Sequence, residues 1–266
     1  MRARPFTAQR LSGRPVRAGW VLLLIFALGC HRQNKVKPIE PVDQVYKQAL
    51  QKIGKKHYFA ARSLLQSLLT RIPQDDRALL PLVQIRLGDA FYLDGGILNL
   101  GEALGTYRNF LTYYPQREEA AYAQYQVGMC YFGQVLAPDR DQDLTFKAII
   151  EFEKVERLYP DSTYVEQAGA RILECRQRLA AHEFGIGRYY YKRKRYLAAA
   201  DRFRVILDKY PHFSETDEVI YLLGCSLFAT SNPDEGRLYF DRLFQEYPDG
   251  KLTRSAKRLL KKQGKG

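Results

Sequence analysis

Three aspartates alternate with other residues at positions 139, 141 and 143, a spacing found at the start of calcium-binding loops. In such a loop the sixth residue is glycine and the twelfth is a glutamate that binds calcium through both oxygens. Counted from Asp139, these positions hold Leu144 and Ile150. The residues that would complete a calcium site are therefore missing, and we expect an aspartate here to cap the following helix by accepting its free N–H groups.

The other side chains that could bind a metal or act as nucleophiles are scattered. The histidines, none at a spacing typical of a nucleophile or a metal site, are His31, His57, His182 and His212. Three cysteines show no CxxC or Cys/His spacing, namely Cys130, Cys175 and Cys225. We expect them to be buried thiols on helices, with one disulfide and one free thiol as the alternative. The pattern predicts no metal, no cofactor and no enzyme, leaving a catalytic site assembled from distant residues as the alternative.

A run of aromatic and basic residues, YYYKRKRY, occupies positions 189–196. Proteins that bind single-stranded nucleic acid combine these residue types. Here, however, the tyrosines fall at the predicted end of a helix, where packing uses them, and the charges fall in the following turn. We therefore expect a solvated turn or a contact with an acidic protein partner, and no nucleic acid.

The N-terminus carries a targeting signal over residues 1–29. Five arginines and no acid precede the apolar run WVLLLIFAL, which is too short to cross a bilayer but suits a signal peptide. The run ends in Ala-Leu-Gly-Cys at 27–30, which is similar to a bacterial lipobox although Ala27 stands where leucine is more usual. The lipobox predicts that Cys30 is acylated, and His31 after it favours the outer membrane over the inner. An ordinary secretory signal or an uncleaved anchor is the alternative.

The two ends of the chain hold nearly all of its net charge of +13. Residues 30–42 form a polar, proline-containing tether between the lipidated cysteine and the first helix. Residues 251–266 contain seven lysines and arginines and no acid. This basic tail predicts a solubilising cap on the last repeat, with contact to anionic lipids as the alternative.

The body of the chain, residues 43–250, is a repeat with a proline at the end of each unit. These prolines are Pro73, Pro115, Pro160, Pro211 and Pro248. Large apolar residues stand eight positions earlier, at Leu65, Tyr107, Phe152, Phe203 and Phe240. Small residues stand twelve positions earlier, at Ala61, Ala103, Ala148, Ala199 and Gly236. This order is typical of the second helix of a tetratricopeptide repeat, and we expect the aromatic ring to fill the gap between repeats.

The first helix of each repeat has its own small residue. Ala49 holds this position in the first repeat, and the later repeats have Gly88, Gly128, Gly187 and Gly224. The sequence therefore predicts an all-α tetratricopeptide-repeat solenoid of about five helix pairs. The proline spacing exceeds 34 residues, which predicts that loops or helices are lengthened, with insertions at Asp94-Gly95-Gly96 and around 133–144. Residues 161–187 predict one unusually long first helix.

The segment from Asp139 to Pro211 resembles the BamD family of lipoproteins, which belong to the outer-membrane β-barrel assembly machinery. The resemblance rests on the DRD at 139–141, YPDSTY at 159–164, RLAAHE at 178–183, Tyr189-Tyr190, Arg193 and the AADRF that ends at Phe203. Residues 43–115 and the last repeat agree only at the level of the repeat.

The resemblance implies a lipid-anchored scaffold on the periplasmic face of the outer membrane. It implies that the N-terminal repeats receive unfolded outer-membrane proteins and that the C-terminal repeats bind the periplasmic repeats of the barrel-forming subunit. Arg202 and Arg193 occupy positions that the family uses at that interface. From its own sequence context, Arg202 is equally an exposed residue of a solvated face. An envelope repeat lipoprotein that regulates peptidoglycan synthesis or cell division is the alternative function.

Overall fold

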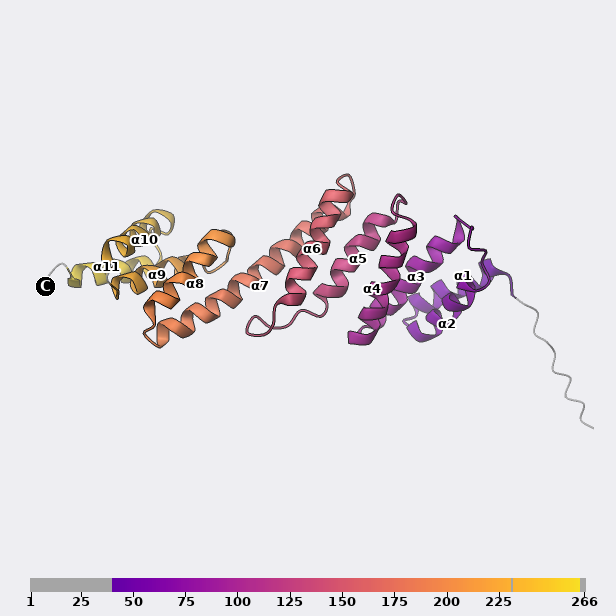
Figure 1. Cartoon of the computed structure of the whole chain (residues 1–266), viewed down its shortest axis with the longest axis horizontal. Helices are drawn as coiled ribbons and strands as arrows, with labels where there is room; N and C mark the ends of the chain where they lie inside the picture. Colours follow the sequence, from indigo (N-terminus) through magenta and orange to yellow (C-terminus); the bar gives the residue numbers. More distant parts are fainter. Residues whose placement is uncertain (1–39, 231, 264–266) are drawn as a thin grey trace, which may run out of the picture. The chain divides into compact units, whose positions relative to one another are not determined.

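A computed structural model describes residues 40–230 and 232–263, and all regular structure in these residues is α-helical. Five antiparallel pairs follow one another, which confirms the predicted all-α solenoid (Figure 1). The pairs are α1 (Val42–Gly54) with α2 (Tyr58–Leu69), α3 (Leu79–Asp94) with α4 (Gly96–Tyr113), α5 (Ala120–Phe132) with α6 (Asp143–Leu158), α7 (Tyr164–Lys192) with α8 (Tyr196–Lys209), and α9 (Thr216–Phe228) with α10 (Pro233–Glu246). A last helix, α11 (Lys251–Gln263), follows the fifth pair.

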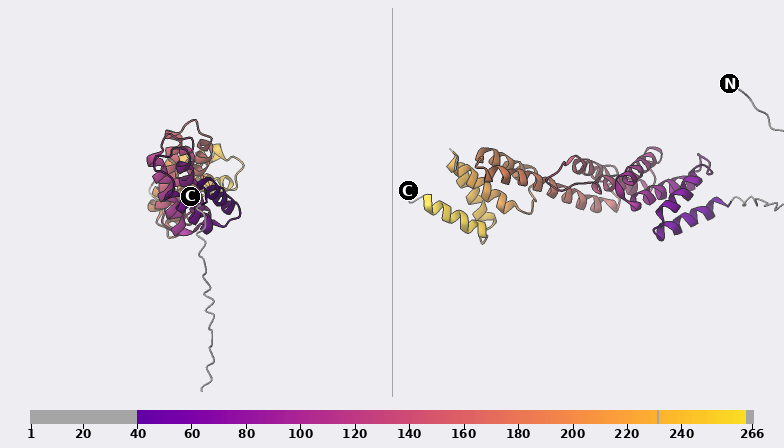
Figure 2. Two further views of the ribbon diagram at one scale, coloured as in Figure 1. Left: turned by 90° about the vertical axis from the view of Figure 1, so that its right-hand side faces the viewer. Right: turned by 90° about the horizontal axis from the view of Figure 1, so that it is seen from below.

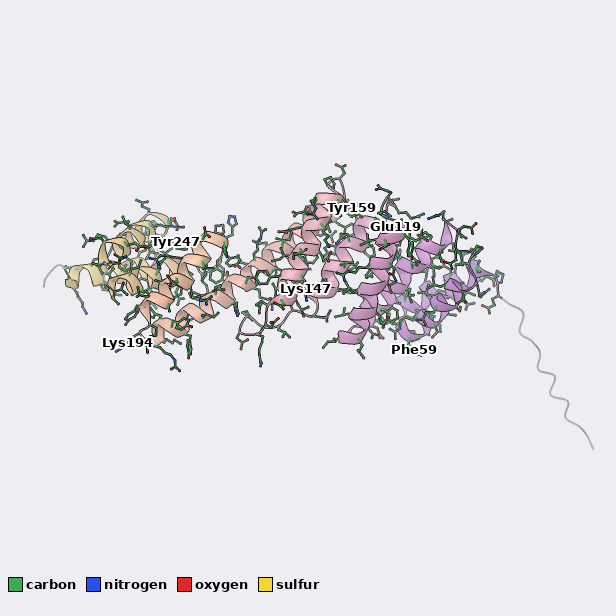
Figure 3. The ribbon with its side chains drawn as sticks, in the orientation of Figure 1. Phe59, Glu119, Lys147, Tyr159, Lys194 and Tyr247 are labelled. Atoms are coloured by element: carbon green, nitrogen blue, oxygen red, sulfur yellow. The ribbon has the colours of Figure 1, made fainter. Side chains whose placement is uncertain are left out.

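Each helix packs on the next one in the chain, so neighbours in sequence are also neighbours in space (Figure 2). The turns within the first repeats lie at one edge, where Phe59 is labelled, and the loops between repeats lie at the opposite edge, where Glu119 and Tyr159 are labelled (Figure 3). This arrangement is expected for a repeat protein, in which one pair cannot bury its apolar face alone and the stacked pairs share a continuous core.

The repeated prolines end the second helices as predicted. In four repeats the helix stops two residues before proline, and the intervening tyrosine leaves the helical conformation, with φ between −131° and −136° and ψ between 48° and 60° at Tyr114, Tyr159, Tyr210 and Tyr247. The proline ring disfavours the helical conformation in the residue before it, which accounts for this geometry. In the first repeat α2 ends earlier, at Leu69, and a turn leads to Pro73.

The repeated apolar positions form the core. All five large residues eight positions before the prolines are fully buried, from Leu65 to Phe240. In four repeats the aromatic ring lies directly on the glycine of the paired first helix. A Cβ atom added to Gly187 would meet the Phe203 ring at 2.5 Å, and the equivalent distances are 2.6 Å at Gly88, 2.5 Å at Gly128 and 2.5 Å at Gly224.

These contacts correct the expected position of the aromatic side chain. The sequence predicted that Phe203 fills the gap between adjacent repeats, but the glycine beneath its ring belongs to α7, the other helix of the same pair. Phe184, also on α7, lies 6.1 Å from Phe203 between ring centroids. The small residue and the ring therefore set the separation of two helices within a pair, because backbones can approach closely only where a side chain is missing.

Both predicted insertions are present in the structure, one as a loop and the other as longer helices. Residues 133–142 form a loop between α5 and α6, as expected. In contrast, Gly95 alone separates α3 from α4, and the extra residues lengthen these helices to 16 and 18 residues. Gly95 and Gly96 have φ values of 71° and 78°, a conformation that glycine adopts without a steric cost. The long helix is α7, with 29 residues.

The signal peptide, Cys30 and most of the predicted tether lie outside the described residues. None of the helices that the structure describes combines the length and the apolar composition needed to cross a bilayer. At the other end, α11 packs on α9 and α10 through Leu252, Ala256 and Leu259, so that its apolar face is used within the chain and its lysines face outward.

Candidate protein-binding site

The loop 133–142 lies against α7 and brings together the segments that carry the family resemblance. The guanidinium of Arg178 donates a hydrogen bond to the carbonyl oxygen of Leu136 at 2.9 Å. One turn later on α7, the imidazole Nδ1 of His182 contacts the carbonyl oxygen of Pro138. The RLAAHE segment therefore holds the loop that contains the DRD segment.

Buried polar contacts hold the loop itself. The amide of Gln142 donates to the carbonyl oxygens of Ala137 and Arg140, each at 3.0 Å, and its oxygen accepts a 2.8 Å hydrogen bond from the hydroxyl of Thr145. Asp141 accepts a 2.9 Å hydrogen bond from the backbone N–H of Asp143, the first residue of α6. The predicted capping role of an aspartate in this segment is thus confirmed.

Arg202 extends from α8 toward α7, where its Nη1 lies 3.0 Å from Oε2 of Glu183. The arginine side chain is 42% exposed and the glutamate side chain 20%. Arg202 is therefore not a free residue of a solvated face, because it already has an acidic partner inside the pair. A guanidinium has five N–H donors, and the exposed fraction leaves this one accessible to a second carboxylate.

Arg193 lies at the C-terminal end of α7, in the turn that joins α7 to α8. Its guanidinium stacks on the ring of Tyr189, with 4.7 Å from the guanidinium carbon to the ring centroid. Lys194 follows with a φ of 58°, so the turn falls within the basic run, as predicted. Arg193 and the 53% exposed Tyr189 together present a cation on an aromatic face at the surface.

The structure does not bring the two predicted interface arginines together. Arg202 pairs with Glu183, which precedes Arg193 by ten residues on α7, or about 15 Å along a helix. Between the loop and the α7–α8 pair lies a hollow of about 530 Å³, whose lining includes Asp139, Phe146, His182, Glu183 and Tyr210. This mixture of exposed apolar and charged groups is suited to a protein surface and offers no arranged set of catalytic groups.

Two buried carboxylates connect the earlier helices, and neither was predicted from the sequence. Asp89 on α3 accepts hydrogen bonds from the hydroxyls of Tyr107 and Tyr122 at 2.7 and 2.6 Å, and Arg86 pairs with its other oxygen at 2.7 Å. Burial raises the pKa of both tyrosines, and the charge of Asp89 raises it further. These hydroxyls therefore stay protonated and act as donors.

Glu151 on α6 is the second buried carboxylate. It accepts hydrogen bonds from Arg108 at 3.0 Å, Lys154 at 2.8 Å and Gln124 at 2.9 Å. Burial raises the pKa of Glu151, but the hydrogen bonds from Lys154, Gln124 and Arg108 outweigh it and hold the pKa below its ordinary value. The carboxylate is thus charged and links α4, α5 and α6, which indicates a structural role.

The three cysteines of the repeats are free and buried, which confirms the expectation of core thiols. Burial raises the pKa of Cys130 to about 12 and that of Cys175 to about 11. Among the described residues no three His, Cys, Asp or Glu side chains gather closely enough to hold a metal ion.

Sequence reasoning missed Glu183 as the partner of Arg202 and missed Arg178 and His182 as the residues that hold the loop. The alignment of α7 with α8 could have indicated the contact between Arg202 and Glu183. Gly187 and Phe203 must lie together, and Glu183 stands one turn before Gly187 while Arg202 directly precedes Phe203.

Known proteins match most of the chain. The model of the family described as YfiO, outer membrane lipoprotein, matches residues 38–226, and a tetratricopeptide-repeat model matches residues 218–250. A relative from Caulobacter vibrioides, outer membrane protein assembly factor BamD, is 26% identical over 95% of this chain and 83% of its own length. The protein of the same name from Rickettsia prowazekii is 26% identical over 90% of this chain and 95% of its own. Among solved structures, the tetratricopeptide domain of P58(IPK) is 14% identical, with a TM-score of 0.40 over 80% of this chain and 53% of that chain.

The family match begins before α1 and ends within α9, so it includes the loop, α7, α8 and the Arg202–Glu183 pair. Since the match extends over more than half of the sequence, the chain belongs to the YfiO family of outer membrane lipoproteins.

Proposed function

We propose that this protein is a lipid-anchored scaffold of the outer-membrane β-barrel assembly machinery. In this role Cys30 carries the acyl anchor at the periplasmic face of the outer membrane. The N-terminal repeats bind unfolded outer-membrane proteins, and the α7–α8 pair binds the periplasmic repeats of the barrel-forming subunit. The name of the relatives, outer membrane protein assembly factor, supports this assignment.

The observation that carries the proposal is the surface formed by the loop 133–142, α7 and α8. It is held by Arg178 and His182 and presents the half-exposed Arg202. A guanidinium that is already oriented by Glu183 loses little side-chain entropy when a partner carboxylate binds. Arg202 therefore contributes to both the fold and the interface, and a test must separate the two.

The charge-swapped pair separates them. Arg202→Glu alone places a second carboxylate beside Glu183 and removes the guanidinium that would bind the barrel-forming subunit. We therefore expect it to lower both the stability of the fold and the affinity for that subunit. Combining it with Glu183→Arg restores an opposite-charge pair inside the protein while leaving an acid at position 202. The stability lost should be small and largely recovered, because a half-exposed ion pair contributes about 0.2–1 kcal/mol.

Binding should not recover in the swapped protein. Losing one partner of a desolvated interfacial charge pair costs about 2–5 kcal/mol of affinity. The measurement is binding of the full chain to the partner's purified periplasmic repeats, beside thermal melts of the wild type, Arg202→Glu and the charge-swapped protein. If the swapped protein binds as well as the wild type, Arg202 acts only inside the fold. If the wild type does not bind, the assembly role itself is wrong and the envelope-regulator alternative gains support.

The anchor is tested separately by labelling with a fatty-acid probe in cells. Cys30→Ala should abolish the label, because the lipobox thiol is the predicted acceptor. Unchanged labelling in this variant would exclude Cys30 as the site.

A further inference from the structure

Four large apolar side chains are exposed at the edge of the first two repeats where the turns within pairs lie. Phe59 on α2 is 76% exposed, Leu93 at the end of α3 is 48% exposed, and Ile97 and Leu98 in the first turn of α4 are 76% and 86% exposed. We call these four residues the edge patch. Phe59 marks this edge in Figure 3.

Arg62 joins the members of the edge patch. Its guanidinium stacks on Phe59 at 5.8 Å and pairs with Asp94, which lies between Leu93 and Ile97 in the chain. The side chain of Asn99 donates hydrogen bonds to Asp94 at 3.1 Å and to the carbonyl oxygen of Gly95 at 2.9 Å. The turn that presents Ile97 and Leu98 is therefore fixed before any partner arrives.

The surroundings of the edge patch are basic. Lys52 in the last turn of α1 and Lys55 and Lys56 in the turn that follows it stand shortly before Phe59, and the two later lysines are exposed. The acids nearest in the chain are Asp94, which pairs with Arg62, Asp89, which is buried and pairs with Arg86, and Glu102, which stands one helical turn farther from the edge. Exposed apolar residues beside lysines are the combination that binds the interface of an anionic membrane.

The length of the chain before α1 allows such a contact. Ten residues join Cys30 to Glu40, which gives a reach of about 33–36 Å. Glu40 lies at the opposite end of α1 from the edge patch, and the 13 residues of α1 span about 20 Å. An acyl chain on Cys30 and the edge patch can therefore lie in the same leaflet.

We infer that the edge patch is a second membrane contact, in which Phe59, Leu93, Ile97 and Leu98 enter the headgroup region of an anionic phospholipid surface. This inference rests on the proposed function because it takes Cys30 as the anchor. A contact that combines apolar and basic residues would add to the attachment through the lipidated cysteine. It also fixes which edge of the first repeats faces the bilayer.

The test uses the acylated full chain with a fluorescent dye on Ile97→Cys, in vesicles of phosphatidylethanolamine and phosphatidylglycerol that contain a lipid-bound quencher. The matched control carries the dye on Tyr113→Cys, at the other end of the same helix and 66% exposed. We expect about twofold or stronger quenching at 97, since an interfacial segment lies roughly 5–10 Å into the headgroup boundary, and little at 113. Phe59→Ser with Leu98→Ser should abolish the quenching at 97.

The lysine contribution has its own readout. Raising the ionic strength to about 0.5 M, where the Debye length is roughly 4 Å, should weaken the quenching at 97. Vesicles without phosphatidylglycerol should weaken it in the same way.

The other outcomes each overturn the inference. Flotation with the vesicles but no quenching at 97 would leave the anchor intact and exclude the membrane contact. Equal quenching at 97 and 113 would mean that the chain lies on the membrane without a preferred edge. A spectral shift at 97 caused only by an unfolded outer-membrane protein would make the edge patch a protein-binding site. If the chain does not float with the vesicles, Cys30 does not anchor it, and the argument from the distance between Cys30 and the edge patch fails as well.

Discussion

Gly187 gives the sharpest test of how the helices within a pair are held. A Cβ atom at this position would lie 2.5, 2.9 and 3.0 Å from three atoms of the Phe203 ring. The ring is completely buried and packs beside Phe184, so it has no open space into which to move. Gly187→Ala must therefore push α7 and α8 apart or force Phe203 out of its preferred rotamer.

Two opposing terms set the magnitude. Overpacking a well-packed core costs about 1–3 kcal/mol. Replacing glycine by alanine inside a helix returns about 0.5–1 kcal/mol through backbone entropy. We place the overpacking in the upper half of its range because three ring atoms are affected, and expect a net loss of about 1–2 kcal/mol in the free energy of unfolding.

Gly185→Ala is the matched control, since Gly185 lies two residues earlier on α7, is exposed, and has no atom within 4 Å of an added Cβ. The helix-propensity term is the same for both variants, so the difference between their unfolding free energies isolates the overpacking. Urea denaturation of the full chain, followed by circular dichroism, measures this difference.

The first repeat shows how the protein accommodates a Cβ atom at this position. Ala49 stands where the other repeats have glycine, the position of the aromatic ring holds the smaller Leu65, and both residues are fully buried in one core cluster. Copying this pair as Gly187→Ala with Phe203→Leu should recover at least about 1 kcal/mol relative to the sum of the single changes. If Gly187→Ala is as stable as Gly185→Ala, or if the double variant shows no coupling, the ring does not set the helix separation.

Two further predictions concern buried ionisable groups. Glu151→Gln should lower stability at neutral pH by about 1.5–3 kcal/mol, the range for hydrogen bonds to a charged group. Glu153→Gln, whose ion pair with Arg176 is about half exposed, should change it by less than about 0.5 kcal/mol. Because the pKa of Glu151 is lowered in the fold, its contribution to stability is present above the ordinary glutamate pKa of about 4.3 and is lost as the pH falls through the lower folded value. Thermal melts between pH 7 and pH 3 should therefore show that the stability of Glu151→Gln depends less on acid than that of the wild type. An unchanged dependence would contradict the structural role of the Glu151 carboxylate. Cys130 and Cys175 should react with a maleimide at least about 100-fold more slowly in the native chain than in urea, because their raised pKa values leave little thiolate at neutral pH; rapid native labelling of either would show that the core opens there.

The sequence alone determined the number and order of the helix pairs. The residues that decide this, such as Gly187, Phe203 and Pro211, act within one helix or between two adjacent helices, so that their spacing along the chain is enough to place them. The unusual length of α7 and the turn at 192–195 could be predicted for the same reason, since helix ends depend on nearby residues.

Contacts between side chains on different helices were decided only by the tertiary structure. Arg202 has the same sequence context whether it faces solvent or Glu183, and Asp89 and Glu151 look like ordinary charged helix residues until the packing buries them. The proline spacing predicted extra residues at Asp94-Gly95-Gly96 in a loop or in helices, and only the structure shows that two positive φ angles allow a turn of one residue and that the extra length lies in the helices. The partners of Arg202, Asp89 and Glu151 depend on helix register, rotamer and burial, which arise only when the helices pack. The repeat pattern, in contrast, is a property of each segment by itself.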